Sequence, residues 1–270
     1  MNANVILYIL MFIIGTLFGS FYTLAVYRIP RKIDIVKTHS FCPNCNHKLG
    51  FWELIPVWSY IFLGGKCKEC KQKIRPRYFI LEILSGLTFV LLSFALKLDI
   101  NTLNINLIIE LSFIVLYLVA VFLIAGIDKE SRVVEKNVLY YAIYVSIIYV
   151  TYLCIIDSEN MLRYAIYLGL IMMLLIVDSL YLRNKAEDNY TISILILLVI
   201  MAIFTSEITT IFTVIGALLI IAGVLIENKI KNKMSKTKKE HKEIINNLHI
   251  GFYLCLSNVI AFITILFIKG

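Results

Sequence analysis

The sequence predicts an all-α polytopic membrane protein of about eight transmembrane helices, with a small zinc-ribbon-like loop domain between the first two. Three observations lead to this fold class. Hydrophobic residues occupy 60% of the 270 positions and charged residues only 16%, whereas soluble domains carry about 25% charged residues. Apolar runs of membrane-spanning length recur along the chain. Two Cys-x-x-Cys pairs lie in the polar segment between the first two runs.

The apolar runs define the expected helices. The first extends from Val5 to about Tyr27 and is followed directly by basic residues. Further spanning runs lie at about 78–96, 104–127, 138–156, 161–182, 190–206, 208–226 and 248–268. We therefore expect three parts, namely a first transmembrane helix (1–27), a cytosolic loop domain (28–77) and a membrane helix bundle (78–270).

The basic residues predict the topology. Threading the chain alternately through a bilayer places residues 28–77, 128–137, 183–189 and 227–247 on one side. These four loops contain 23 of the 26 Lys and Arg residues, and such a bias marks the cytosolic side. Both termini are then outside. Because the net charge of +8 lies on these loops, its expected partner is anionic membrane lipid and not nucleic acid.

The loop domain contains the pairs CPNC and CKEC, separated by 21 residues. Two such pairs at this separation are typical of a four-thiolate zinc site, because each forms a tight turn and the loop brings the turns together. The expected ligands are Cys42, Cys45, Cys67 and Cys70. Disulfides are the alternative in an oxidising compartment, but a cytosolic loop keeps its thiols reduced. Two flanking histidines, His39 and His47, are alternative ligands.

Carboxylates within or beside apolar runs are candidate functional groups, because ionisable residues are costly in a bilayer. They are Glu82, Glu110, Asp128, Asp178, Glu187 and Asp188. All except Glu110 lie at the expected inner ends of their helices. Two neighbouring carboxyls at one membrane face suit the general acid and general base of an aspartic protease. Capping of helices is the simpler interpretation, and an ion path is disfavoured because the groups do not lie at the midplane.

Four segments carry a resemblance to a known family. They are GSFYTLAVYRIPR (19–31), the two cysteine pairs, FWELIPVWSYIFLGGKC (51–67) and IRPRYFILEILSG (74–86). Together they closely resemble the N-terminal half of the bacterial type IV prepilin peptidases. The resemblance implies a bifunctional enzyme of the bacterial inner membrane. Such an enzyme removes the leader of type IV prepilin or pseudopilin precursors at the cytosolic face, after a glycine, and then methylates the new N-terminus with S-adenosylmethionine.

The resemblance also implies two catalytic aspartates. Asp128, in GIDKESRVVEKN, matches the first. Asp188 lies 60 residues further on, where the family carries the second. The surrounding KAEDNYT, however, lacks the two glycines that precede this aspartate in the family and the lysine that follows it. Asp178 and Glu187 are the alternative partners, and Asp188 also suits a helix N-cap.

Two interpretations of function remain open. The chain is either an active enzyme with a divergent C-terminal half, or a catalytically impaired paralogue that acts as a membrane scaffold or binding partner in pilus or secretion assembly. No glycine-rich nucleotide loop indicates where S-adenosylmethionine binds. Glu82 either faces an active-site cavity or pairs with Arg75 or Arg77 at the interface.

Overall fold

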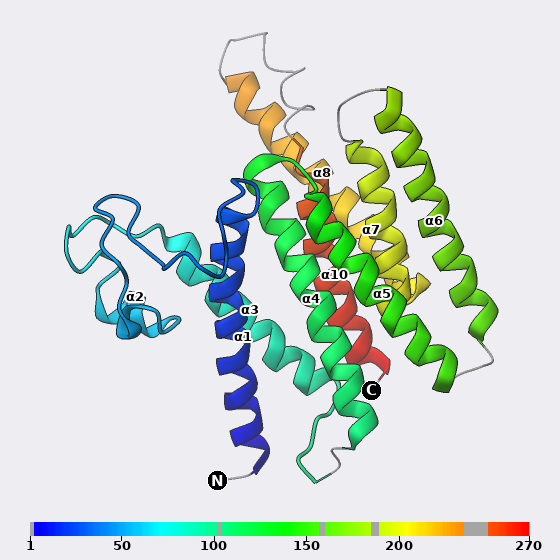
Figure 1. The fold of residues 1–270 in the computed structure, drawn as a ribbon, viewed down its shortest axis with the longest axis horizontal. Coiled ribbons are helices and arrows are strands. Elements are labelled where there is room, and N and C mark those ends of the chain that lie inside the picture. The colour runs from blue at the N-terminus through cyan, green and yellow to red at the C-terminus, as the bar shows by residue number, and fades with distance from the viewer. Residues whose placement is uncertain (1–2, 102–103, 157–159, 185–188, 235–247, 270) are drawn as a thin grey trace. The chain divides into compact units, whose positions relative to one another are not determined.

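The computed structural model describes residues 3–101, 104–156, 160–184, 189–234 and 248–269, and within these ranges the chain is helical with no β-strand beyond two isolated bridges (Figure 1). The elements are α1 (Ala3–Arg28), η1 (Phe51–Glu53), α2 (Trp58–Phe62), α3 (Pro76–Ala95), α4 (Ile105–Ser131), α5 (Lys136–Ile156), α6 (Met161–Asn184), α7 (Tyr190–Thr205), α8 (Glu207–Met234) and α10 (Ile250–Lys269).

Every predicted span coincides with one of these helices, which confirms the all-α membrane fold. Among the described residues, seven helices are long and apolar enough to cross a membrane. The exception is α7, whose 16 residues extend only about 24 Å at 1.5 Å per residue, less than the hydrocarbon thickness of about 30 Å. The chain divides into two compact units, residues 1–108 with 266–270 and residues 109–265.

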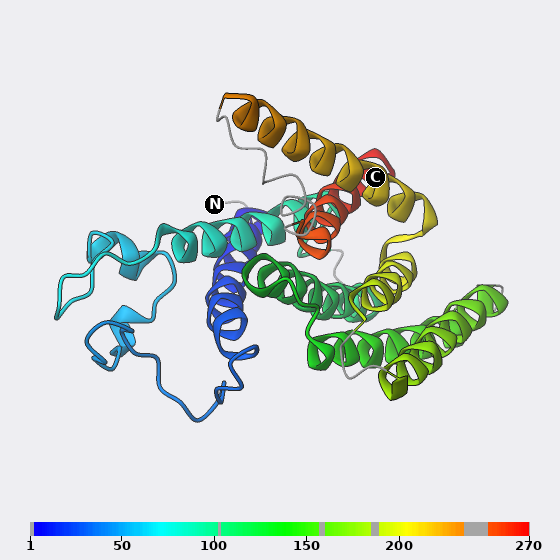
Figure 2. The same cartoon turned by 90° about the horizontal axis from the view of Figure 1, so that it is seen from above.

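In the first unit, α1 and α3 are in backbone contact. A Cβ atom on Gly15 would lie 2.8 Å from the Cα of Gly86, and one on Gly19 would lie 2.7 Å from the Cα of Glu82. Figures 1 and 2 show the two helices crossing. In lipid, where apolar side chains gain little by associating, small residues four apart drive helices together through close packing. Gly15 and Gly19 have this spacing.

The second unit is packed around α7, which contacts α5, α6 and α8. Most of the α7 side chains are buried, so its short length is explained by its protein surroundings. Near its C-terminal end, Phe204 stacks on Tyr117 of α4 and Tyr149 of α5 with ring centroids 4.6 and 4.7 Å apart. Aromatic contacts thus join three helices of this unit.

A buried hydrogen-bonded chain links α4 to two further helices of the same unit, α8 and α10. The Tyr117 hydroxyl donates to Asn258 Oδ1 of α10 at 2.5 Å, and Asn258 Nδ2 donates to Thr213 Oγ1 of α8 at 3.0 Å. Asn258 and Thr213 are completely buried. Since a buried polar group must find a partner within the bundle, this chain fixes the rotation of α8 and α10.

The glycine contact in the first unit makes a testable prediction. Replacing Gly19 with Val places a side chain against the α3 backbone, which should lower the stability by roughly 1–3 kcal/mol and the melting temperature by several degrees. The measurement is thermal unfolding in detergent. Gly169→Val is the matched control, because a Cβ there has no neighbour within 4 Å. Equal melting temperatures for the two variants would contradict the close approach.

Candidate metal centre and carboxylate site

The four loop cysteines converge as predicted. Their Sγ atoms all lie within 4.8 Å of one another, with 3.9 Å between Cys42 and Cys70 and between Cys45 and Cys67. A tetrahedral zinc ion with bonds of about 2.3 Å places its four sulfurs about 3.8 Å apart. All four cysteines are free thiols. The cluster therefore fits zinc, and the disulfide alternative is wrong for this structure.

Both cysteine pairs lie in the same kind of turn. In the first, the Cys42 N–H donates to the His47 carbonyl at 2.9 Å, and the Cys42 carbonyl accepts from the Asn46 N–H at 2.9 Å. The equivalent residues in the second are Cys67, Gln72 and Lys71, with distances of 2.9 and 3.1 Å. Asn46 and Lys71 have φ angles of 56° and 57°, in the left-handed region that closes each turn.

His47, beside the first turn, is paired with a carboxylate. His47 Nε2 lies 3.0 Å from Glu53 Oε2, and Glu53 also accepts the Gly50 N–H at 2.9 Å. The Gly50 hydrogen bond, with a smaller contribution from His47, holds the pKa of Glu53 below its usual value. Among the described residues, the group able to hold a metal comprises the four cysteines and neither His39 nor His47.

Arg28, one of the basic residues used to predict the topology, is buried. Its guanidinium donates to the carbonyls of Asp34, Thr38 and His39 at 3.1, 2.7 and 3.1 Å, and to that of Ile35 at 3.3 Å. It is 4% exposed. Arg28 therefore fastens the start of the loop domain to the end of α1.

Glu82 faces a cavity of about 270 Å³ in the first unit, which Cys42 and Cys67 also line. Its Oε2 accepts the Val57 N–H at 2.7 Å. Glu82 thus links α3 to the segment before α2 and completes the wall of this cavity.

Asp128 is completely buried near the C-terminal end of α4, and it meets the first turn of α10. Oδ2 accepts the Phe252 N–H at 2.9 Å, and the Asp128 carbonyl lies 2.7 Å from His249 Nδ1. Because a carbonyl only accepts, Nδ1 carries the proton. The first N–H groups of a helix lack partners within the helix, so the Asp128 carboxylate serves as a cap supplied by another helix.

Tyr190, the first residue of α7, completes this site. Its hydroxyl donates to Asp128 Oδ1 at 2.9 Å and accepts the Gly251 N–H at 2.9 Å. A Cβ atom on Gly251 would lie 3.2 Å from Asp128 Cγ, so glycine permits the close approach. The site thus joins α4, α7 and α10. Neither Tyr190 nor His249 was predicted, since no motif marks them.

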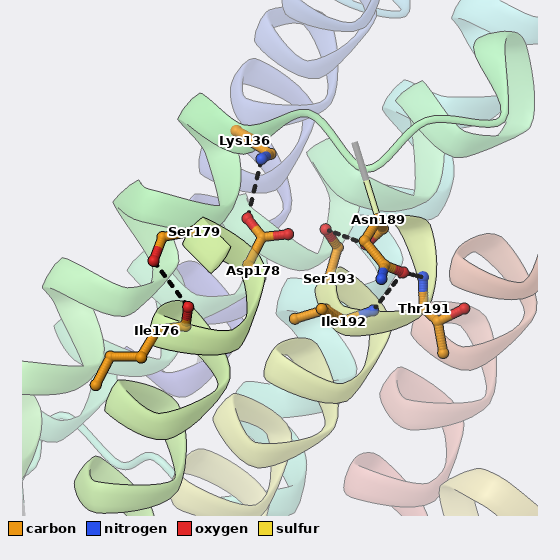
Figure 3. A network of polar contacts seen from close by, with 8 residues as sticks. All are labelled: Lys136, Ile176, Asp178, Ser179, Asn189, Thr191, Ile192 and Ser193. Carbon is orange, nitrogen blue, oxygen red and sulfur yellow. Dashed lines mark hydrogen bonds and ion pairs between the residues drawn. The ribbon is translucent and has the colours of Figure 1, made fainter. Parts of the chain in front are cut away.

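The other candidate carboxylates, proposed as partners of Asp128, differ in what the structure shows of them. Asp178 forms an ion pair with Lys136 at 2.9 Å, which favours a structural role. The N-cap of α7 is Asn189, whose Oδ1 accepts the Thr191 and Ile192 N–H groups. Figure 3 shows Asp178 and Asn189 at the same end of neighbouring helices. Asp188 and Glu187 lie outside the described residues, and the N-cap role considered for Asp188 belongs to its neighbour.

Comparison with known proteins supports the resemblance. Residues 13–96 match the family described as the bacterial peptidase A24 N-terminal domain. The resemblance to prepilin peptidases is confirmed for this part of the chain. The family match ends before α4, so it covers the cysteine cluster and not Asp128. No solved structure matches the chain significantly.

Three relatives carry the same description, "Prepilin leader peptidase/N-methyltransferase". The one from Vibrio cholerae is 39% identical over 85 residues, covering 28% of this chain and 34% of the relative. That from Bacillus subtilis is 40% identical over 80 residues, covering 30% and 32%, and that from Neisseria gonorrhoeae is 31% identical over 105 residues, covering 30% and 37%. The chain thus spans about a third of the length of these relatives.

The cysteine geometry makes a direct prediction. The purified protein should contain about one zinc ion per chain, and Cys70→Ser should lose it because three thiolates hold zinc more weakly than four. Elemental analysis of the gel-filtered protein measures the ratio. Cys154→Ser is the matched control, since Cys154 lies in α5, outside the cluster. Zinc retained by Cys70→Ser would contradict the assignment.

Tyr190 provides a second prediction. Tyr190→Phe leaves the Gly251 N–H and Asp128 Oδ1 without their hydroxyl partner, which should destabilise the protein by about 1–3 kcal/mol. Tyr144→Phe, at an exposed position of α5, should change the melting temperature little. If both variants had the same melting temperature as the wild type, the Tyr190 hydroxyl would not hold the site together.

Proposed function

We propose that the chain is a membrane aspartic endopeptidase that removes the leader of type IV prepilin-like precursors and methylates the new N-terminus. The observation that carries the proposal is a completely buried aspartate at the end of a membrane helix, bonded to the first turns of two others. The peptidase and methyltransferase activities follow the description of the relatives.

In this proposal, Asp128 is one member of a catalytic pair. Its carboxylate lies at the N-terminus of α10, where the helix dipole and the Phe252 N–H favour a negative charge. An ionised carboxylate suits the general base, which takes a proton from water as the water oxygen attacks the carbonyl carbon of the glycine that ends the leader. The second carboxyl, protonated, donates to the departing amine.

Asp188 is the proposed partner. It precedes Tyr190 by two residues, so their Cα atoms are at most about 7 Å apart whatever the backbone conformation. Tyr190 in turn donates to Asp128. The closeness of Asp188 in sequence to a residue that binds Asp128 supports the assignment made from the resemblance.

The proposed topology places the site at the cytosolic face of the bacterial inner membrane, with both termini outside. The bias of Lys and Arg toward four loops supports it. The apolar helix of the precursor would then lie in the bilayer and present its leader in the cytosol. Zinc has a structural role in the loop domain, and S-adenosylmethionine is the proposed methyl donor.

A second candidate function rests on the same site. Both oxygens of the Asp128 carboxylate already accept hydrogen bonds, as expected of a purely structural cap. This favours a catalytically impaired paralogue that acts as a scaffold or binding partner in pilus or secretion assembly. Incubating the purified full-length protein with a prepilin separates the two, because only an enzyme shortens the precursor.

The choice of Asp188 as the catalytic partner of Asp128 gives a specific prediction. Asp188→Asn should reduce leader removal about a hundredfold or more, as expected for loss of a general acid or base, whereas Asp178→Asn should retain most of it because Asp178 pairs with Lys136. Mass spectrometry of the precursor over time measures both rates. The reverse order of the two variants would assign Asp178 as the partner and contradict the proposal.

A further inference from the structure

The loop domain exposes an apolar surface between the two cysteine turns. We call it the aromatic surface, and its residues are Phe51, Trp52, Leu54, Trp58, Ile61 and Phe62, all exposed. Trp52 and Phe62 are the most open, at 78% and 79%. The rings are grouped in pairs, with Phe51 against Trp52 and Trp58 stacked on Phe62. Contiguous apolar surfaces of this kind mark an interaction site.

Two contacts fix the depth of this surface relative to the membrane helix α3. The Val57 N–H, directly before α2, donates to Glu82, which lies six residues into α3 and thus about 9 Å along it. Tyr60 of α2 stacks on Phe79 of α3 with centroids 4.8 Å apart. The aromatic surface is therefore held alongside the first two turns of a membrane-spanning helix, and not beyond its end.

The ribbon agrees with these contacts. Figure 1 shows α2 to the left of α1, at a level below the C-terminal end of that helix. Both α1 and α3 have the length and hydropathy of membrane spans. Where these two helices span a bilayer, a segment at this level is close to the bilayer surface.

The charges of the loop domain suit the same surroundings. Exposed basic residues flank the aromatic surface on both sides in sequence, namely Lys48, Lys66, Lys68, Lys71, Lys73 and Arg75. Trp at the level of the headgroups, together with Lys and Arg facing anionic lipid, is the combination typical of a membrane interface.

We propose that the segment from η1 to α2 is an interfacial element whose aromatic surface inserts into the headgroup region of the bilayer. Helices of this type lie about 5–10 Å deep, at the boundary of headgroups and acyl chains, and the contacts with the first two turns of α3 suit such a position. The occupant of the surface is lipid. The loop domain is then held at the membrane at three places, by α1, by α3 and by the aromatic surface.

The backbone directly before α2 makes a tight turn at Val57. Val57 has φ 65° and ψ −53°, and the Trp58 N–H donates to the Pro56 carbonyl at 2.7 Å. This is a γ-turn with positive φ, a rare and strained conformation for a β-branched residue. The Glu82 carboxylate holds the turn through the Val57 N–H. Glu82 is therefore a positioning residue that sets the direction of α2.

The chain offers a sharp test, because its only two tryptophans, Trp52 and Trp58, both belong to the aromatic surface. The full-length protein is placed in nanodiscs of phosphatidylcholine and phosphatidylglycerol, with or without bromine on the upper part of the acyl chains. Brominated lipid should quench the tryptophan fluorescence about twofold or more, as expected for side chains at the interface.

Single-tryptophan variants locate the insertion. Trp52→Phe and Trp58→Phe should each remain quenched by brominated lipid and shielded from aqueous iodide, with gel filtration confirming that the variants are folded. Quenching by iodide without any effect of bromine would overturn the proposal. Shielding from both quenchers would also overturn it, because a protein, such as a second copy of this chain, would then cover the surface.

Discussion

The second unit depends on the contact between the Asp128 carboxylate and the first turn of α10. A helix that begins in protein surroundings leaves its first N–H groups without partners, and each unpaired group is costly away from water. Asp128 satisfies the Phe252 N–H directly and, through Tyr190, is linked to the Gly251 N–H. One carboxylate therefore fixes the ends of α4, α7 and α10 relative to one another.

The same arrangement explains how a structural cap can also be a reactive group. A helix N-terminus stabilises a negative charge, and the surrounding helices exclude bulk water from the Asp128 side chain. Chemistry at this point would need a second carboxyl nearby, and the proposed candidate is Asp188, two residues before Tyr190 in the sequence. The first unit is built on a different principle, with glycines bringing α1 and α3 into backbone contact and four cysteines converging in the loop between them.

The sequence predicts the parts of this protein that depend on local pattern. The run at 78–96 corresponds to α3 at Pro76–Ala95, because hydropathy alone selects a span. The cysteine cluster is equally predictable, since its spacing constrains the loop. Tyr190 and His249 were missed because tertiary packing alone brings them to Asp128. Arg28 was correctly assigned to the end of a span, but its burial depends on carbonyls that only the folded loop brings together.

In the proposed function, Asp128 performs chemistry in addition to capping α10. Asp128→Asn tests it most directly, because the amide oxygen of Asn can still accept the Phe252 N–H while the side chain can no longer take up a proton. The measurement is the rate of leader removal from a prepilin by a variant whose melting temperature stays close to that of the wild type. We predict a loss of about a hundredfold or more, as for removal of a general base. An unchanged rate in the folded variant would show that Asp128 is only a structural cap.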